Sequence, residues 1–118
     1  MKIDHSKQDY HKIAIKEKSK ISFINICEIL YLQCDGYLTT INLLNNKRII
    51  VAKLLKHFEY ELGEYGFIRS NHSTLINSRY ISALKISKQR RIIIIKENEI
   101  HISRRKFYIL KDFLVQKT

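Results

Sequence analysis

The sequence predicts a mainly β domain of antiparallel strands with one or two short helices. Isoleucine supplies 21 of the 118 residues, whereas alanine supplies only three. β-Branched side chains lose rotamer freedom in helices and pack well on pleated sheets, so this bias favours strands. Short alternating or apolar runs follow one another with connections too short for the crossovers of a parallel sheet. A chain of 118 residues is long enough for one domain and too short for two.

Strand signals recur through the first half of the chain. Ile13 and Ile15 alternate with Lys12, Ala14 and Lys16, which is the period of a half-buried strand. Asp35-Gly36 and Asn45-Asn46 are turn signals between apolar runs. We therefore expect strands, in order, at residues 12–16, at 21–32 with a break at 25–28, at 37–44 and at 47–51.

Two segments have helical spacing instead. Between residues 52 and 62 the apolar residues recur on one helical face, and Gly63 stands where a C-cap would. Between residues 103 and 114, Phe107, Leu110 and Leu114 again share a face, and Ser103 can accept a backbone N–H at the helix start. These stripes predict packing against a core.

A second group of strands lies between these helices. Residues 81–86, 91–96 and 99–102 are predicted to form a meander, with Lys88-Gln89 and Asn98 at its turns. Because no glycine-rich or proline-rich linker interrupts the chain, we divide it only into a flexible N-terminal tail, residues 1–9, and one domain, residues 10–118.

Composition argues against several classes of protein. The cysteines, Cys27 and Cys34, are too few for a disulfide scaffold, and their spacing of seven matches no zinc motif, so both are expected as free thiols. The N-terminus lacks the apolar run of a signal peptide, and the longest purely apolar run is residues 92–95. We expect a cytoplasmic protein with no membrane partner, metal or cofactor.

The sequence also offers no catalytic site. It contains no phosphate-cradling glycine loop and no nucleophile elbow. The four aspartates are scattered, and the five histidines form no close pair. We therefore expect that the protein is not an enzyme.

Positive charge is concentrated in one part of the chain. The formal net charge is +11, and residues 67–106 hold ten Lys and Arg against only Glu97 and Glu99. One sign of charge gathered on part of a sheet suits a phosphate backbone, where each neutralised phosphate releases a counterion. The partner is therefore expected to be a polyanion.

The segment FIRSNHSTLIN, residues 67–77, holds a run of polar residues between two pairs of apolar anchors, Phe67-Ile68 and Leu75-Ile76. We expect a loop that is pinned on both sides by buried residues and presents hydrogen-bonding side chains. Together with ISRRKF at 102–107 and EILYLQCDGYLTTI at 28–41, this segment resembles the LytTR DNA-binding domain. The resemblance covers about residues 10–113. Asn71-His72 stands where that family commonly has histidine followed by a basic residue.

The resemblance implies an elongated antiparallel β-sheet domain of LytTR type, the effector half of many bacterial response regulators of two-component systems. In such domains, loops enter successive major grooves of double-stranded DNA, usually at imperfect direct repeats that bind two copies.

The resemblance places Tyr37, His72 and Arg105 at the base edges. Arginine can address both guanine acceptors, and histidine can donate to or accept from a base edge. It places phosphate contacts or loop supports at Arg69, Ser73, Asn77, Arg90, Arg91, Arg104 and Lys106.

A phosphate-sensing receiver domain would need about 100 further residues, so we expect either an excised effector domain or a free-standing transcription regulator. A free-standing regulator would be controlled by abundance, by a regulatory protein partner or by dimerisation. Two alternatives stay open: a small basic RNA-binding module, and a nuclease that uses His72 with Arg69.

Overall fold

The computed structural model describes residues 5–115, so the first four residues of the expected tail and the last three of the expected domain lie outside it. Within this range the chain forms ten strands and two α-helices, which confirms the mainly β fold class. The strands are β1 Lys12–Lys16, β2 Ile21–Asn25, β3 Ile29–Asp35, β4 Leu38–Leu43, β5 Arg48–Val51, β6 Phe67–Asn71, β7 Thr74–Asn77, β8 Ile81–Ser87, β9 Arg90–Ile95 and β10 Asn98–His101. The helices are α1 Leu55–Leu62 and α2 Arg104–Val115.

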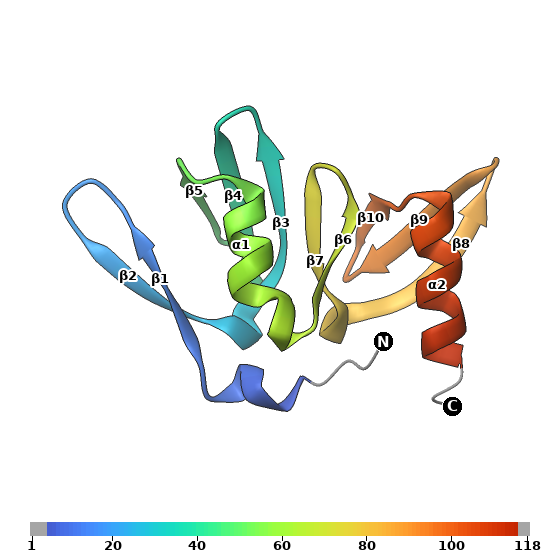
Figure 1. Ribbon diagram of the computed structural model, residues 1–118, viewed down its shortest axis with the longest axis horizontal. Coiled ribbons are helices and arrows are strands. Elements are labelled where there is room, and N and C mark those ends of the chain that lie inside the picture. The colour runs from blue at the N-terminus through green and yellow to red at the C-terminus, as the bar shows by residue number, and fades with distance from the viewer. Residues whose placement is uncertain (1–4, 116–118) are drawn as a thin grey trace.

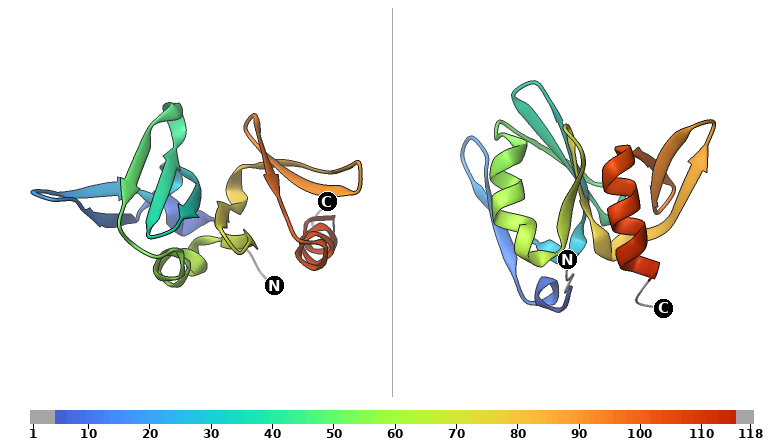
Figure 2. Two further views of the ribbon diagram at one scale, coloured as in Figure 1. Left: turned by 90° about the horizontal axis from the view of Figure 1, so that it is seen from above. Right: turned by 45° about the vertical axis from the view of Figure 1, so that its right-hand side comes forward.

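The strands form three antiparallel sheets in a molecule whose longest axis measures 44 Å. β1 and β2 pair alone, the second sheet has the order β5-β4-β3-β7-β6, and the third has the order β10-β9-β8. Figure 1 shows the sheets following one another along the long axis. Both helices lie on the same side of the strands (Figure 2). None of the helices in residues 5–115 is long and apolar enough to span a membrane.

Most predicted turns are confirmed. The β3–β4 turn contains Gly36, whose φ of 61° is the left-handed conformation that glycine adopts without strain. Lys88 and Gln89 form the β8–β9 turn, with φ values of 50° and 66°. Two successive residues at positive φ match the right-handed twist of the flanking strands, which is why such turns close hairpins.

Two local predictions were wrong. Residues 67–77 form the β6–β7 hairpin with a turn at His72-Ser73, not a loop between anchors. Asn98 begins β10, because the turn before it is made by the two preceding residues. The predicted C-cap of α1 is confirmed: Gly63 stands there with a right-handed φ of −58°, and the left-handed residue is Gly66, with a φ of 91°, just before β6.

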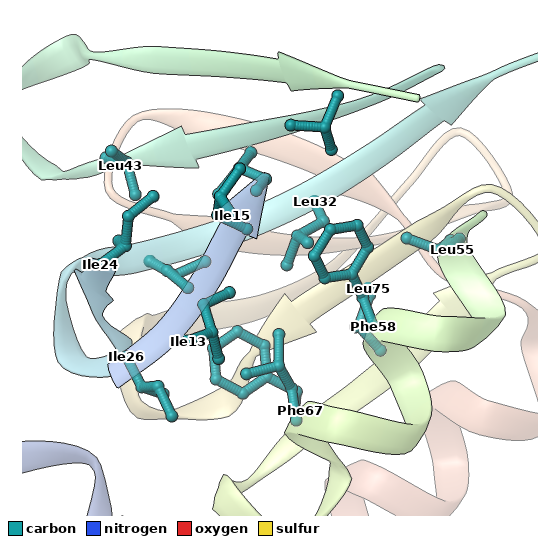
Figure 3. Packing of buried hydrophobic residues seen from close by; sticks show 14 residues of the cluster. Ile13, Ile15, Ile24, Ile26, Leu32, Leu43, Leu55, Phe58, Phe67 and Leu75 are labelled. Carbon is teal, nitrogen blue, oxygen red and sulfur yellow. The ribbon is translucent and has the colours of Figure 1, made fainter. Parts of the chain in front are cut away.

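Two clusters of buried apolar side chains form the core. The first joins β1 and β2, the five-stranded sheet and α1, and Figure 3 shows Ile13 and Ile15 of β1 entering it together with Phe58 of α1. The second joins the three-stranded sheet to α2 through Ile93, Phe107 and others. The helical stripes predicted from spacing therefore do pack against a core.

Strand β7 belongs to both clusters. All four of its residues are buried, with Leu75 in the first cluster and Ile76 in the second. Successive side chains of a strand point to opposite faces, so a strand between two cores must be apolar on both. β7 therefore lies between the two halves of the molecule and contributes side chains to the core of each.

The N-terminal segment packs against the end of β7. Ser6–Asp9 form a 3₁₀ helix, and Gln8 is fully buried. The Gln8 and Asn77 amides donate to each other at 2.9 and 3.0 Å, and Gln8 also donates to the Tyr65 carbonyl at 2.6 Å. Residues 5–9 were assigned to a flexible tail. In the structure they are part of the packed domain, since burial of these amides requires the partners they find here.

Replacing Gln8 with alanine should lower the free energy of unfolding by roughly 1–3 kcal/mol, because the Tyr65 carbonyl and the Asn77 amide lose their partner. Urea denaturation followed by circular dichroism measures this difference. Lys7→Ala, on the exposed side of the same turn, is the control and should stay within about 0.5 kcal/mol of the parent. Equal stability of the two variants would contradict the buried amide pair.

Candidate nucleic-acid interface

Three connections from distant parts of the sequence lie along one edge of the molecule, the upper edge in Figure 1. They are the β3–β4 turn, the β6–β7 turn and the connection from β10 into α2. The first contains Tyr37, the second contains His72 and Ser73, and the third leads into Arg104 and Arg105. The structure thus brings the three expected DNA-contacting segments to the same edge.

Hydrogen bonds tie the middle turn to its neighbours on both sides. The Cys34 backbone N–H donates to the Ser73 carbonyl at 2.9 Å, which joins the end of β3, just before the first turn, to the second turn. The Ser103 N–H donates to the Ser70 carbonyl at 3.0 Å, which joins β6, just before the second turn, to the segment that leads into α2. Because backbone groups make these bonds, they fix the spacing of the turns without using the side chains at their tips.

The three residues expected at base edges have free polar ends. Tyr37 is 85% exposed, and His72 and Arg105 are also exposed. Across residues 5–115, none of these three side chains makes a hydrogen bond or an ion pair. Their polar groups are therefore available to a ligand at this edge.

The residues expected at phosphates or as supports fall into two groups. Arg90, Arg104 and Lys106 are exposed cations, and in the part of the chain that the structure describes they form no ion pair. The others are half-buried or buried and have partners within the fold. Arg91 lies against a tyrosine ring, Ser73 hydrogen-bonds its neighbour Asn71, and the remaining two are described next.

Arg69 and Asn77 support the hairpin from within. The Arg69 Nη1 donates to the His72 carbonyl at 2.5 Å, and its Nε lies 3.2 Å from Glu59 Oε1, a charge contact without hydrogen-bond geometry. The nuclease alternative pairs Arg69 with His72, but this guanidinium is already engaged. Asn77 is fully buried at the end of β7 away from the turn and donates to the Ile29 carbonyl at 2.8 Å.

An open groove of about 630 Å³ lies beside the middle turn. Its lining includes His72 and Arg90, but also His101, which sequence reasoning did not select. Asn71 was likewise missed, although it directly precedes His72 in the motif. Its side chain donates to the His101 carbonyl at 2.7 Å. No sequence signal showed that β6 and β10 would lie side by side.

The start of α2 adds positive potential to this edge. The first intrahelical bond runs from the Phe107 N–H to the Ser103 carbonyl. The N–H groups of the three preceding residues therefore have no partner within the helix, and the helix dipole places partial positive charge there. Arg104, Arg105 and Lys106 add three full charges at the same place. This end of α2 attracts anions.

A comparison with known protein families identifies this arrangement. The profile of the LytTr DNA-binding domain matches residues 19–114. The chain belongs to the LytTR family. This result confirms the resemblance carried by the FIRSNHSTLIN and ISRRKF segments. LytTR domains are DNA-binding domains of response regulators, so the family supports DNA binding by this chain.

A solved LytTR structure has the same fold. It is the LytTr DNA-binding domain of a Bacillus cereus protein named as a methyl-accepting/DNA response regulator. The TM-score is 0.71 at 18% sequence identity, over 88% of this chain and 96% of the other. No curated protein matches this chain. Within residues 5–115 of this LytTR domain, no three His, Cys, Asp or Glu side chains form a group that could hold a metal ion.

The contact between Arg91 and Tyr108 changes the pKa of the tyrosine, which can be measured. The Arg91 Nη2 donates to the Tyr108 hydroxyl at 3.4 Å, and its guanidinium lies 5.4 Å from the ring centroid. This hydrogen bond and the charge of Arg91 lower the pKa of Tyr108, with smaller contributions from Arg104 and Lys111. A phenol surrounded by cations ionises more easily because the phenolate is stabilised.

Replacing Arg91 with glutamine should therefore raise the pKa of Tyr108 towards its ordinary value. Absorbance titration of the phenolate measures the shift when the curve of a Tyr108→Phe protein is subtracted. Lys85→Gln removes a charge that is instead paired with Glu99 and is the control. An unchanged Tyr108 titration in Arg91→Gln would show that the two side chains do not meet in solution.

Proposed function

We propose that this LytTR domain binds double-stranded DNA sequence-specifically through loop side chains in the major groove, as a bacterial transcription regulator or its effector domain. The observation that carries the proposal is the single edge on which three hydrogen-bonded turns present unpaired polar side chains. The three turns lie side by side along the long axis of the molecule, between the β1–β2 hairpin at one end and the β8–β9 hairpin at the other (Figure 1). The major groove is wide enough to admit a two-stranded β-ribbon, so turns at this edge can enter it.

The side chains at this edge suit distinct contacts. Arg105 can donate two hydrogen bonds to guanine O6 and N7, and His72 can contact a base edge from the tip of its turn. Tyr37 offers a hydroxyl and a ring from the first turn. The exposed cations Arg90, Arg104 and Lys106 fit the phosphates on either side, which position the protein without reading sequence. Affinity then comes mostly from phosphate neutralisation and selectivity from the three turns.

Further features of the proposal follow from the family resemblance. They are imperfect direct repeats as targets, two copies that meet as a homodimer on DNA, a regulatory protein partner, a cytoplasmic location and a place in a two-component system.

The RNA-binding alternative has less support. Single strands are bound by stacking successive bases on aromatic side chains that share a surface. The most exposed aromatics here are Tyr10, Phe23, Tyr37 and Tyr60, and they lie on four different elements or connections. Such scattered rings do not form a stacking platform.

Arg105→Ala should weaken binding to the preferred duplex by roughly 1–3 kcal/mol and reduce discrimination at one base pair. Lys88→Ala, at the β8–β9 turn, should instead weaken all duplexes about equally, because a phosphate contact carries no sequence information. Fluorescence anisotropy with the preferred and a random duplex measures both effects. Equal losses on the two duplexes for Arg105→Ala would remove Arg105 from the base-reading residues.

The experiment that tests the function is repeated selection from a random duplex pool, followed by anisotropy at two salt concentrations. A recurring motif bound with a steep salt dependence would establish a sequence-reading duplex binder. Unselective binding, or tighter binding to single-stranded RNA, would favour the RNA-binding module.

A further inference from the structure

The two larger sheets meet edge to edge at the DNA-facing end of the molecule. β6 is the edge strand of the five-stranded sheet, and β10 is the edge strand of the three-stranded sheet. The two strands do not pair with each other. At this junction the Ser103 N–H bonds to the Ser70 carbonyl, and the Asn71 side chain bonds to the His101 carbonyl. These two hydrogen bonds hold the sheets together in place of the backbone hydrogen bonds that two paired strands would form.

Asn71 makes contacts on both sides of this junction. Its Oδ1 accepts from the backbone N–H and from the hydroxyl of Ser73, both at 2.9 Å, and so closes the turn around His72. Its Nδ2 donates to the His101 carbonyl at 2.7 Å. The oxygen and the nitrogen of this amide are not interchangeable. If the amide were reversed, its NH₂ group would face the Ser73 N–H and its oxygen would face the His101 carbonyl oxygen, so neither hydrogen bond could form.

A β-bulge directs Asn71 towards β10. The register of the β6–β7 pair shifts between Arg69 and Asn71, so that Ser70 is the extra residue and is fully buried. Bulges of this kind re-aim the side chains that follow them. The bulge explains how one residue can both close its own turn and reach the neighbouring sheet.

We infer that Asn71 is a positioning residue that makes the His72 turn and the Arg105 segment one recognition unit. The inference rests on the proposed function and deepens it. His72 lies between Asn71 and Ser73, and the His101 carbonyl lies in the segment that leads to Arg105. Holding both fixes the spacing between two base-reading side chains before DNA arrives. Preorganised contacts bind more tightly because less ordering is needed on binding.

Asn71→Ala should weaken binding to the selected duplex roughly tenfold, the effect of losing one or two hydrogen bonds that hold the contacts in place. Binding to a random duplex and the salt dependence should stay unchanged, because no phosphate contact is removed. Discrimination at the base pairs read by His72 and by Arg105 should fall together. Asn98→Ala is the matched control, since Asn98 lines the same groove but its side chain, within residues 5–115, donates to the Ile95 carbonyl on its own sheet and not across the junction.

Asn71→Ser separates the two contacts. A serine hydroxyl can accept from the Ser73 N–H within the turn but is too short to reach the His101 carbonyl. The serine variant should regain discrimination at the His72 base pair only. In the parent, the effects of His72→Ala and Arg105→Ala should be coupled, whereas in Asn71→Ser they should add independently. Regained discrimination at both positions, or persistent coupling, would overturn the bridging role.

A measurement on the protein without DNA tests the role of Asn71 independently of the proposed function. Amide hydrogen exchange at Ser73 in the free protein should accelerate in Asn71→Ala and much less in Asn71→Ser or Asn98→Ala. Unchanged exchange at Ser73 in Asn71→Ala would overturn the inference whatever the protein binds. Accelerated exchange in a protein that selects no duplex motif would instead count against the proposed function alone.

Discussion

The rest of the structure depends on the burial of β7 on both of its faces. Leu75 and Ile76 point into different apolar clusters, so this strand holds the two halves of the molecule together. The polar residues at its ends, Thr74 and Asn77, are buried as well. Since the turn at His72-Ser73 directly precedes β7, both cores fix the place of that turn. The turn that we propose to face DNA is thereby supported by a strand whose four residues are all buried.

Acidic residues determine which cations stay available at the surface. Glu59 lies beside Arg69, Glu99 pairs with Lys85, and Asp9 pairs with Arg79. In contrast to these paired cations, the first turn of α2 carries three cations that make no ion pair within residues 5–115. The excess charge is therefore not spread evenly. Like charges left together repel one another, and an anionic partner relieves that repulsion.

The sequence allowed much of the fold to be predicted, because the strand and helix periods of most elements are clear. The β6–β7 hairpin was not predicted, since Ser70 and Thr74 are polar residues that are nevertheless buried. Gln8 was placed in a tail for the same reason. At the candidate site, charge and motif located the exposed arginines and His72. The bridging contact of Asn71 depends on two sheets meeting edge to edge, which no local pattern encodes.

The β8–β9 turn combines a strained backbone with a charged residue at the tip of the hairpin. Lys88 and Gln89 both adopt positive φ without being glycine or asparagine. A left-handed conformation costs an ordinary residue about 1–2 kcal/mol. An Asn-Gly pair would close the same hairpin with less strain, and it would remove a lysine from the tip. The turn is thus a place where thermostability could be gained by engineering, at the expense of the electrostatic reach of the domain.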